Sequence, residues 1–276
     1  MRNAWKHIVL IAVALLVAYP FYYMVSTAFK SFAEATASPP TVFPTELHPE
    51  NFAEAWESAP WPRYFLNTLL IAGVTTAGEL VVSVLAGYAF AQMSFRGKAV
   101  AFTVVLATYM MPAEATLIPN FVLMTRLFRP NDPTRLVDGY LVQVLPFVAT
   151  AFSIFLLRQQ FLAFPQELKD AARMDGAGHV RFLWSVVLPN SVPALVTVGI
   201  IGFLGSWNAF QWPLIMTSRP DIQPIQIGLN AFRGEAGSSY HLLMAAAAFV
   251  VAPVVALYLV GQRYLVQGVA RTGIRG

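Results

Sequence analysis

Six long apolar stretches constrain this 276-residue chain more than any other feature. A helix rises about 1.5 Å per residue, so about 20 apolar residues cross the roughly 30 Å of hydrocarbon in a bilayer. Only 12% of the residues are charged, whereas a soluble domain carries about a quarter. We therefore predict an all-α, polytopic membrane protein with about six transmembrane helices. The stretches run approximately over Ile8–Phe29, Thr68–Ala91, Val100–Met124, Leu136–Leu157, Ser191–Met216 and Leu242–Gln262.

Prolines interrupt the third to fifth stretches at Pro112, Pro119, Pro146 and Pro193. Each proline removes a backbone donor and tends to kink a helix. Kinked helices remain compatible with a membrane when neighbouring helices satisfy the freed carbonyl groups. We expect bends in these three spans.

The first stretch follows Arg2 and Lys6, and Ala33-Glu34-Ala35 offers small residues at the spacing of a signal-peptide cleavage site. The apolar run is longer than the 7–15 residues of a signal peptide's apolar region. It is therefore predicted to be a retained membrane anchor.

Basic residues favour an orientation with both termini in the cytoplasm. With a cytoplasmic amino terminus, eleven Lys and Arg residues lie in inside segments and seven in the longer outside segments. Basic residues concentrate on the cytoplasmic side of membrane proteins. Arg126, Arg129 and Arg135, in a short outside loop, count against this assignment.

The polar stretch Lys30–Asn67 is predicted to be an irregular outer loop with one short helix near Asn51–Ser58, because it contains many prolines. No tandem repeat or low-complexity tract is visible. The whole chain, 1–276, is interpreted as one membrane domain.

The inside loop between the fourth and fifth spans, 158–190, has the pattern of two short helices joined at a glycine. Pro165 suits a first helical turn, and Glu167 and Asp170 favour the positive end of a helix. Gly176 permits the left-handed conformation that ends a helix. A second apolar run ends at Leu188-Pro189, where the chain must turn into the fifth span.

This loop resembles the cytoplasmic E-A-A loop of ABC importer permeases, in the form found in the carbohydrate branch. Its motifs Asp170-Ala171-Ala172, Asp175-Gly176-Ala177 and Leu188-Pro189 match in order and spacing over some twenty positions. Asp170 replaces the usual glutamate, so the charge is kept on a side chain shorter by one methylene. The family motifs Tyr-Ala, Met-Pro, Ile-Pro, Trp-Asn and a Gly-rich basic tail are matched by Tyr88-Ala89, Met111-Pro112, Ile118-Pro119, Trp207-Asn208 and Gly273-Ile274-Arg275-Gly276.

The resemblance is to the smaller of two permease subunits in sugar or glycerol-phosphate importers, and it implies the type I permease fold. It also implies a second permease subunit as heterodimer partner, two ATPase subunits, an extracytoplasmic solute-binding protein and residence in a bacterial or archaeal cytoplasmic membrane. ATP and Mg²⁺ would be bound by the ATPase, and no cofactor by this chain.

In this family the loop helix sits in a cleft of the ATPase and passes its motion to the membrane helices. By resemblance, the predicted coupling residues are Glu167, Asp170, Ala171, Ala172, Asp175, Gly176, Ala177 and Pro189. An amphipathic connector that merely joins two spans is the alternative interpretation of the same loop.

Glu79 lies near the middle of the second span, where an ionised side chain costs at least a few kcal/mol unless it faces protein or water. It is interpreted either as a contact in the translocation cavity or with the partner permease, or as a protonated or hydrogen-bonded packing residue. Glu114, after Pro112, is either an outer-gate residue or a solvated carboxylate.

The fifth span contains a polar and aromatic cluster, Trp207, Asn208, Gln211 and Trp212. Aromatic faces beside amides suit sugar rings, whereas packing and interface anchoring explain tryptophans equally well. Gly199, Gly202 and Gly205 recur every three residues and predict close helix packing.

No catalytic or metal site is predicted, because the chain has no Cys, no H-E-x-x-H motif and no Walker-type phosphate loop, and its four histidines are scattered. The basic residues lie scattered between apolar runs, which argues against a nucleic-acid partner. Two alternatives stay open: an importer permease for amino acids, peptides or inorganic anions, and a self-sufficient secondary transporter or channel, which needs intramembrane ion sites or an inverted repeat.

Overall fold

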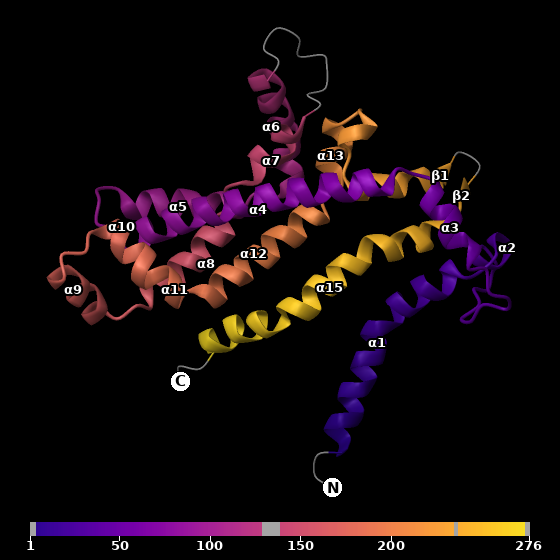
Figure 1. The fold of residues 1–276 in the computed structure, drawn as a ribbon, viewed down its shortest axis with the longest axis horizontal. Helices are drawn as coiled ribbons and strands as arrows, with labels where there is room; N and C mark the ends of the chain where they lie inside the picture. Colours follow the sequence, from indigo (N-terminus) through magenta and orange to yellow (C-terminus); the bar gives the residue numbers. More distant parts are fainter. Residues whose placement is uncertain (1–3, 129–138, 235–236, 274–276) are drawn as a thin grey trace. The chain divides into compact units, whose positions relative to one another are not determined.

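The computed structural model describes residues 4–128, 139–234 and 237–273, and these are overwhelmingly helical (Figure 1). A two-residue hairpin, in which Arg233 pairs with Ser238 and Gly234 with Gly237, is the one sheet within these ranges. The all-α prediction is therefore confirmed. The longer elements are α1 (Ala4–Ala28), α3 (Glu50–Glu57), α4 (Trp61–Gln92), α5 (Lys98–Tyr109), α6 (Ala113–Phe128), α8 (Ala151–Leu162), α9 (Gln166–Met174), α12 (Val192–Trp207), α13 (Gln211–Met216) and α15 (Tyr240–Gly273).

Short elements connect these helices. They are α2 (Phe32–Ala35), α7 (Tyr140–Val144), the 3₁₀ turn η1 (Leu145–Phe147), α10 (His179–Phe182), the π-helical turn η2 (Leu183–Val187), α11 (Leu188–Asn190), the 3₁₀ turn η3 (Pro220–Ile222), α14 (Ile225–Gly228), the 3₁₀ turn η4 (Leu229–Phe232), β1 (Arg233–Gly234) and β2 (Gly237–Ser238).

Three described helices are individually long and apolar enough to cross a bilayer, namely α1, α4 and the α15 segment Tyr240–Gln262. Three bent pairs bring the number to six if each pair counts as one span: α5 with α6 at 103°, Tyr140–Phe147 with α8 at 45°, and His179–Asn190 with α12 at 80°. Six is the predicted number.

The expected bends lie at prolines or within a few residues of them. Pro112 occupies the break between α5 and α6, Pro146 lies in η1, and Pro193 follows the 80° bend at the start of α12. Pro119, by contrast, is accommodated inside α6.

Several predicted boundaries need correction. The second span begins at Trp61 instead of Thr68, because Pro62 is compatible with a first helical turn and the Trp61 indole donates to the Ala55 carbonyl at 2.7 Å. The stretch Val100–Met124 is broken at Met110–Pro112, and Ser191–Met216 is broken at 208–210. Leu136, the predicted start of the fourth span, and Ile274–Gly276 of the predicted tail lie outside the described residues.

Contacts divide the chain into two compact units, one formed by 1–64 with 225–256 and the other by 65–224 with 257–276. The helices α4 and α15 each contribute residues to both units. This division does not test the interpretation of the chain as one membrane domain, which stays a prediction.

In the first unit, α1 exposes nearly all of its apolar side chains, as Leu16 does at 74%, which suits contact with lipid. The loop after α1 is ordered by polar contacts. Asn51, at the start of α3, donates to the carbonyls of Ala28 and Lys30 at 2.9 and 2.8 Å. The short helix predicted near Asn51–Ser58 is observed as α3, and its position on the outer side stays a prediction.

Glu34 organises the same loop. Its carboxylate accepts hydrogen bonds from the Thr41 hydroxyl at 2.9 Å and from the backbone N–H and hydroxyl of Thr45 at 3.0 and 3.1 Å. Partial burial raises the pKa of Glu34, but these bonds and the nearby Lys30 charge outweigh it, so that the pKa lies below its ordinary value of 4.5.

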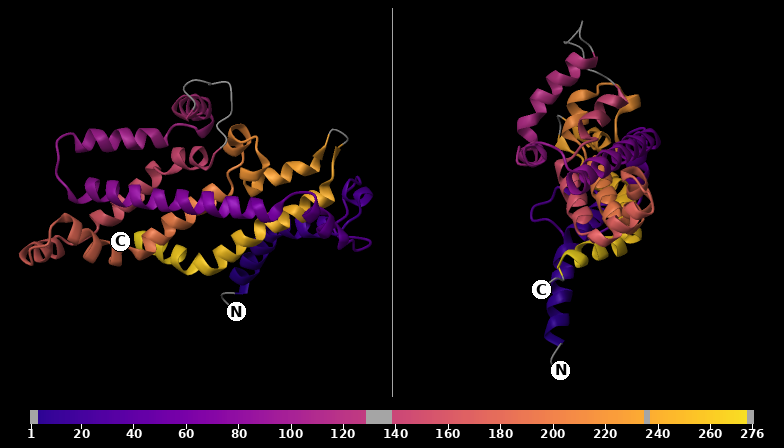
Figure 2. Two further views of the ribbon diagram at one scale, coloured as in Figure 1. Left: turned by 45° about the horizontal axis from the view of Figure 1, so that its top comes forward. Right: turned by 90° about the vertical axis from the view of Figure 1, so that its left-hand side faces the viewer.

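The second unit is built around α4. Figure 1 shows α8 and α12 running beside it, and two close contacts fix that packing. A side chain at Gly87 would meet the backbone of Arg158 on α8, and Gly199 of α12 lies against Leu80. Figure 2 shows α9 and α10 at the end of this unit where α4 terminates.

We predict that Glu34→Gln lowers the thermal unfolding midpoint of the purified protein at neutral pH. A carboxyl whose folded-state pKa is depressed contributes stability above its unfolded pKa, and this contribution is lost as the pH falls through the lower folded value. At pH values above 4.5, the ordinary pKa of the group, the wild type should therefore have a higher unfolding midpoint than the variant. In more acidic solution the two midpoints should converge. A difference that persists unchanged into acid would contradict the role of Glu34.

Candidate functional site

The segment Pro165–Pro189, hereafter the coupling segment, has the predicted form of two helical pieces joined at a glycine. Pro165 precedes α9, Glu167 lies in its first turn, and Arg173 in its last. Gly176 has φ +73°, the left-handed conformation that glycine adopts without strain, and its N–H donates to the Arg173 carbonyl at 3.0 Å. The bend after Pro189 turns the chain into α12.

One face of the coupling segment is attached to the end of α4. The Lys169 ammonium donates to the Gln92 carbonyl at 3.0 Å, and the Tyr88 hydroxyl and His179 Nδ1 lie 3.0 Å apart. Phe182, Leu183 and Val187 are buried in one apolar cluster with Tyr88 of α4 and with Leu157 and Phe161 of α8. The segment is therefore in direct contact with both α4 and α8.

The other face is exposed and carries most of the predicted coupling residues. Asp170 accepts a hydrogen bond from Gln166 at 3.1 Å and lies 3.9 Å from Arg173. Asp175 and Gly176 are exposed, and Ala172 and Ala177 are half-buried. Large apolar side chains share this exposure, Met174 at 84% and Trp184 at 66%. Carboxylates beside exposed apolar side chains suit a protein partner with a basic, apolar cleft.

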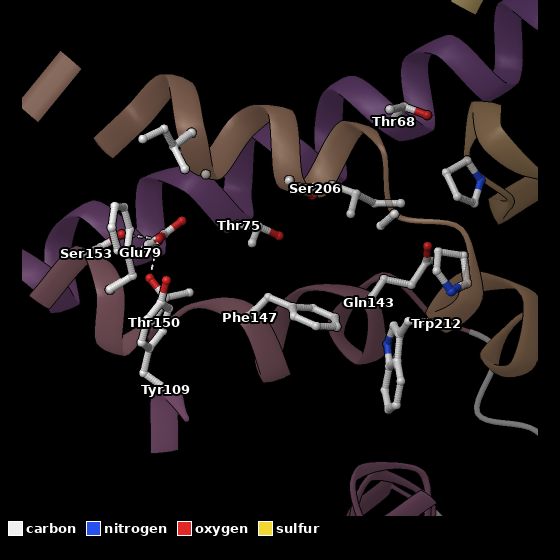
Figure 3. A pocket seen from close by; sticks show the side chains of 18 residues that line it. Thr68, Thr75, Glu79, Tyr109, Gln143, Phe147, Thr150, Ser153, Ser206 and Trp212 are labelled. Carbon is white, nitrogen blue, oxygen red and sulfur yellow. Dashed lines mark hydrogen bonds between the residues drawn. The ribbon is translucent and has the colours of Figure 1, made fainter. Parts of the chain in front are cut away.

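A cavity of about 620 Å³ lies within the second unit, and we call it the interhelical cavity (Figure 3). Residues of α4, α5, α7, η1, α8, α12 and α13 line it. Figure 3 shows Glu79, Thr150 and Ser153 at one end, Gln143 and Trp212 at the other, and Thr75 and Phe147 between them. Its volume falls within the range of about 300–1,000 Å³ typical of small-molecule sites.

Glu79 joins three helices at one end of this cavity. Its Oε1 accepts hydrogen bonds from the Thr150 hydroxyl and from the Ser153 hydroxyl, the latter at 2.6 Å, while the carboxylate rests against Gly202 of α12. The side chain is 4% exposed. Glu79 is therefore hydrogen-bonded to its neighbours and also lines this cavity, while its role in a translocation cavity or at the partner permease stays a prediction.

Of the six predicted pathway residues, Glu79 and Trp212 line the cavity. Trp212 donates from its indole to the Val142 carbonyl at 3.0 Å, and its ring meets Phe147 edge-on at 5.8 Å. Trp207 is buried and stacks on Phe203, which favours the packing interpretation. Glu114, Asn208 and Gln211 are exposed and are not among the lining residues.

The three regularly spaced glycines of α12, Gly199, Gly202 and Gly205, lie in two different environments. Gly199 and Gly202 pack closely against side chains of α4, as predicted. A side chain at Gly205 would meet no atom within 4 Å, and this residue lines the cavity instead.

Sequence reasoning missed Thr75, Gln143, Thr150 and Ser153 as lining residues. A signal was available for two of them. Thr75 precedes Glu79 by one helical turn and therefore shares its face, and Gln143 is an amide inside a predicted span. Thr150 and Ser153 had no such signal, because only the bend before α8 brings them to Glu79. Within the described ranges, no group of three or more His, Asp or Glu side chains could hold a metal ion.

Comparisons with known proteins agree on one family. Residues 80–271 match the family described as binding-protein-dependent transport system inner membrane component. The chain is 31% identical over 270 residues to the sn-glycerol-3-phosphate transport system permease protein UgpE of Yersinia pestis bv. Antiqua (strain Antiqua), covering 95% of this chain and 94% of that protein. It is 30% identical over 267 residues to the arabinooligosaccharides transport system permease protein AraQ of Halalkalibacterium halodurans, covering 96% and 93%.

The fold matches that of a chain in the crystal structure of a bacterial ABC transporter involved in the import of the acidic polysaccharide alginate. The TM-score is 0.79 at 24% sequence identity, and the match covers 95% of each chain.

We predict that Gly202→Ala destabilises the protein by about 1–3 kcal/mol, the cost of leaving a buried polar group unpaired. The added Cβ would collide with the Glu79 carboxylate and displace it from Thr150 and Ser153. Thermal unfolding in detergent measures the effect. Gly205→Ala on the same helix is the matched control, because its Cβ meets no atom within 4 Å, and it should equal or exceed the wild type in stability. Equal unfolding midpoints for both variants would contradict the contact.

Proposed function

Because this chain belongs to the family of binding-protein-dependent transport system inner membrane components, we propose that it forms half of the translocation pathway of an ATP-driven importer. The family is a membrane transport component, not a catalytic one. The proposed cargo is a sugar, an oligosaccharide or a glycerol-phosphate-type solute. The names of two relatives support it, since one is a permease protein for sn-glycerol-3-phosphate and the other for arabinooligosaccharides.

The proposed assembly contains a second permease subunit, two ATPase subunits and an extracytoplasmic solute-binding protein. The family description supports the last of these, since it names dependence on a binding protein. ATP and Mg²⁺ belong to the ATPase subunits in this proposal, and this chain binds no cofactor.

The coupling segment is the proposed contact with the ATPase. One observation carries this proposal: the segment is fastened by Lys169, Tyr88 and His179 to the end of α4, while Asp170, Asp175 and Gly176 remain exposed on its other face. An amphipathic connector explains the exposed acidic residues but not the large apolar side chains, such as Met174, that are exposed beside them. This arrangement suits a segment that binds a partner on its exposed face and transmits the partner's motion to the membrane helices on its other face.

Both termini are proposed to be cytoplasmic, in a bacterial or archaeal cytoplasmic membrane, which places the coupling segment on the side of the ATPase. The basic residues of the inside segments support this orientation. Two alternatives remain distinguishable by experiment: an importer for a solute other than a carbohydrate, and a transporter that works without an ATPase.

The assay for the proposal as a whole is purification with the ATPase, partner permease and binding protein, followed by ATPase measurements with a panel of solutes. Stimulation by a carbohydrate or glycerol phosphate supports the proposed cargo, and stimulation only by an amino acid, peptide or inorganic anion contradicts it. Solute movement by the purified chain alone, without ATP, would contradict the importer itself.

We predict that Gly176→Pro and Asp170→Lys reduce solute-stimulated ATP hydrolysis by about tenfold or more, as expected for the loss of a charge-assisted contact. Proline cannot adopt φ +73° and lacks the N–H that bonds the Arg173 carbonyl. Reversal of the Asp170 charge would repel a basic cleft. Both variants should still insert and assemble.

Matched controls separate coupling from folding. Gly178→Ala should leave stimulation unchanged, because Gly178 has φ −75°, which any residue adopts, and a Cβ there meets no atom within 4 Å. Asp170→Glu keeps the charge and should retain activity. Normal stimulation in both Gly176→Pro and Asp170→Lys would remove the coupling assignment.

We predict that a single cysteine at Asp175→Cys reacts with a membrane-impermeant thiol reagent only from the cytoplasmic side. The wild-type chain has no cysteine, so that labelling reports on this position alone. Labelling of intact right-side-out vesicles is the measurement, with permeabilised vesicles as the positive control. Reaction from the outside of intact vesicles would overturn the proposed orientation.

A further inference from the structure

We propose that the interhelical cavity binds an uncharged, hydroxyl-rich solute directly, with Thr75 and Gln143 as its polar contacts. This inference rests on the proposed importer function and narrows its cargo. It excludes anionic solutes such as glycerol phosphate and acidic sugars, and it assigns part of the solute site to this subunit.

Two buried polar atoms that line the cavity point to a ligand. The Thr75 hydroxyl oxygen and the Gln143 Oε1 have no hydrogen-bond partner among the described residues, and both side chains are 2% exposed. Figure 3 shows both side chains directed into the cavity. Buried polar atoms are nearly always paired, so two unpaired ones in a single cavity indicate a group that is to be bound there.

The Gln143 amide is held in a defined orientation. Its Nε2 donates to the Ile222 carbonyl at 3.2 Å, which leaves Oε1 as the amide atom without a partner among the described residues. An amide oxygen accepts hydrogen bonds and cannot donate them. The missing partner at this end of the cavity must therefore be a donor.

The end of the interhelical cavity opposite Gln143 also carries a hydrogen-bond acceptor, Glu79. Glu79 receives its two hydroxyl donors on Oε1, and its carboxylate borders the cavity. A solute that carries several O–H groups can donate to Gln143 and exchange hydrogen bonds with Thr75. A fully ionised phosphate or carboxylate group offers acceptors only, so the donor to the amide oxygen must be a hydroxyl group of the solute.

The charges that line the cavity argue against anionic solutes. None of the described residues that line the cavity is Lys, Arg or His, whereas Glu79 is among them. Burying an anion without a cationic partner is unfavourable. The aromatic rings of Phe147 and Trp212 line the same space, and such rings suit the apolar faces of a sugar ring.

Thr75→Val tests the proposal with little risk to the fold, because it removes a hydroxyl that bonds no described residue and keeps the shape of the side chain. The complete importer, with partner permease, ATPase and binding protein, is reconstituted in proteoliposomes. We expect the solute concentration for half-maximal uptake to rise about three- to tenfold, the value of one hydrogen bond. Thr76→Val is the matched control, since Thr76 also has an unpaired buried hydroxyl on α4 but does not line the cavity.

A mixture of uncharged sugars, sugar phosphates, sn-glycerol-3-phosphate and uronate oligosaccharides is the probe, and mass spectrometry of the vesicle contents identifies what ATP has driven inside. Accumulation of uncharged sugars alone, together with the expected difference between Thr75→Val and Thr76→Val, supports the proposal.

The outcomes separate this inference from the proposed function. ATP-driven accumulation of phosphorylated or uronate solutes overturns the inference and leaves the importer intact. The same holds if Thr75→Val and Thr76→Val transport alike, as expected if the partner permease fills the cavity. No ATP-dependent accumulation of any solute by the wild-type assembly would contradict the importer function itself.

Discussion

A carboxylate in the middle of an apolar helix must be satisfied by neighbouring side chains, and this requirement organises the second unit. Glu79 on α4 accepts from Thr150 and Ser153 at the start of α8 and rests against Gly202 of α12. Lipid offers no hydrogen bonds, so these contacts hold the three helices in one arrangement. The same arrangement leaves the interhelical cavity beside them.

The coupling segment and the cavity share α4. Tyr88, which contacts His179 of the coupling segment, lies nine residues after Glu79, a distance of roughly 14 Å along a helix. Both residues also contact α8, through Ser153 at one end and the Leu157–Phe161 cluster at the other. The coupling segment is therefore in contact with two of the helices that line the cavity. This continuity connects the surface proposed to contact the ATPase with the cavity proposed to bind the solute.

Sequence reasoning succeeded where local chemistry decides the outcome. Gly176 was expected in a left-handed conformation and has φ +73°, and Pro112 was expected to bend its span and lies at a 103° break. It failed where contacts between residues far apart in the sequence decide the outcome. The sequence places Trp207 and Trp212 in the same cluster of the fifth predicted span and does not distinguish them. In the structure Trp207 packs on Phe203, whereas Trp212 lines the cavity.

The sequence by itself determined the number of apolar spans, the all-α class and the pattern of the coupling segment, because apolar length, glycine and proline act through neighbouring residues. Only the tertiary structure decided that Thr150 and Ser153 satisfy Glu79, and that Thr75 and Gln143 face one cavity with unpaired oxygens. The physical reason is that these relations join residues up to 74 positions apart, so they exist only after the bent helices have packed.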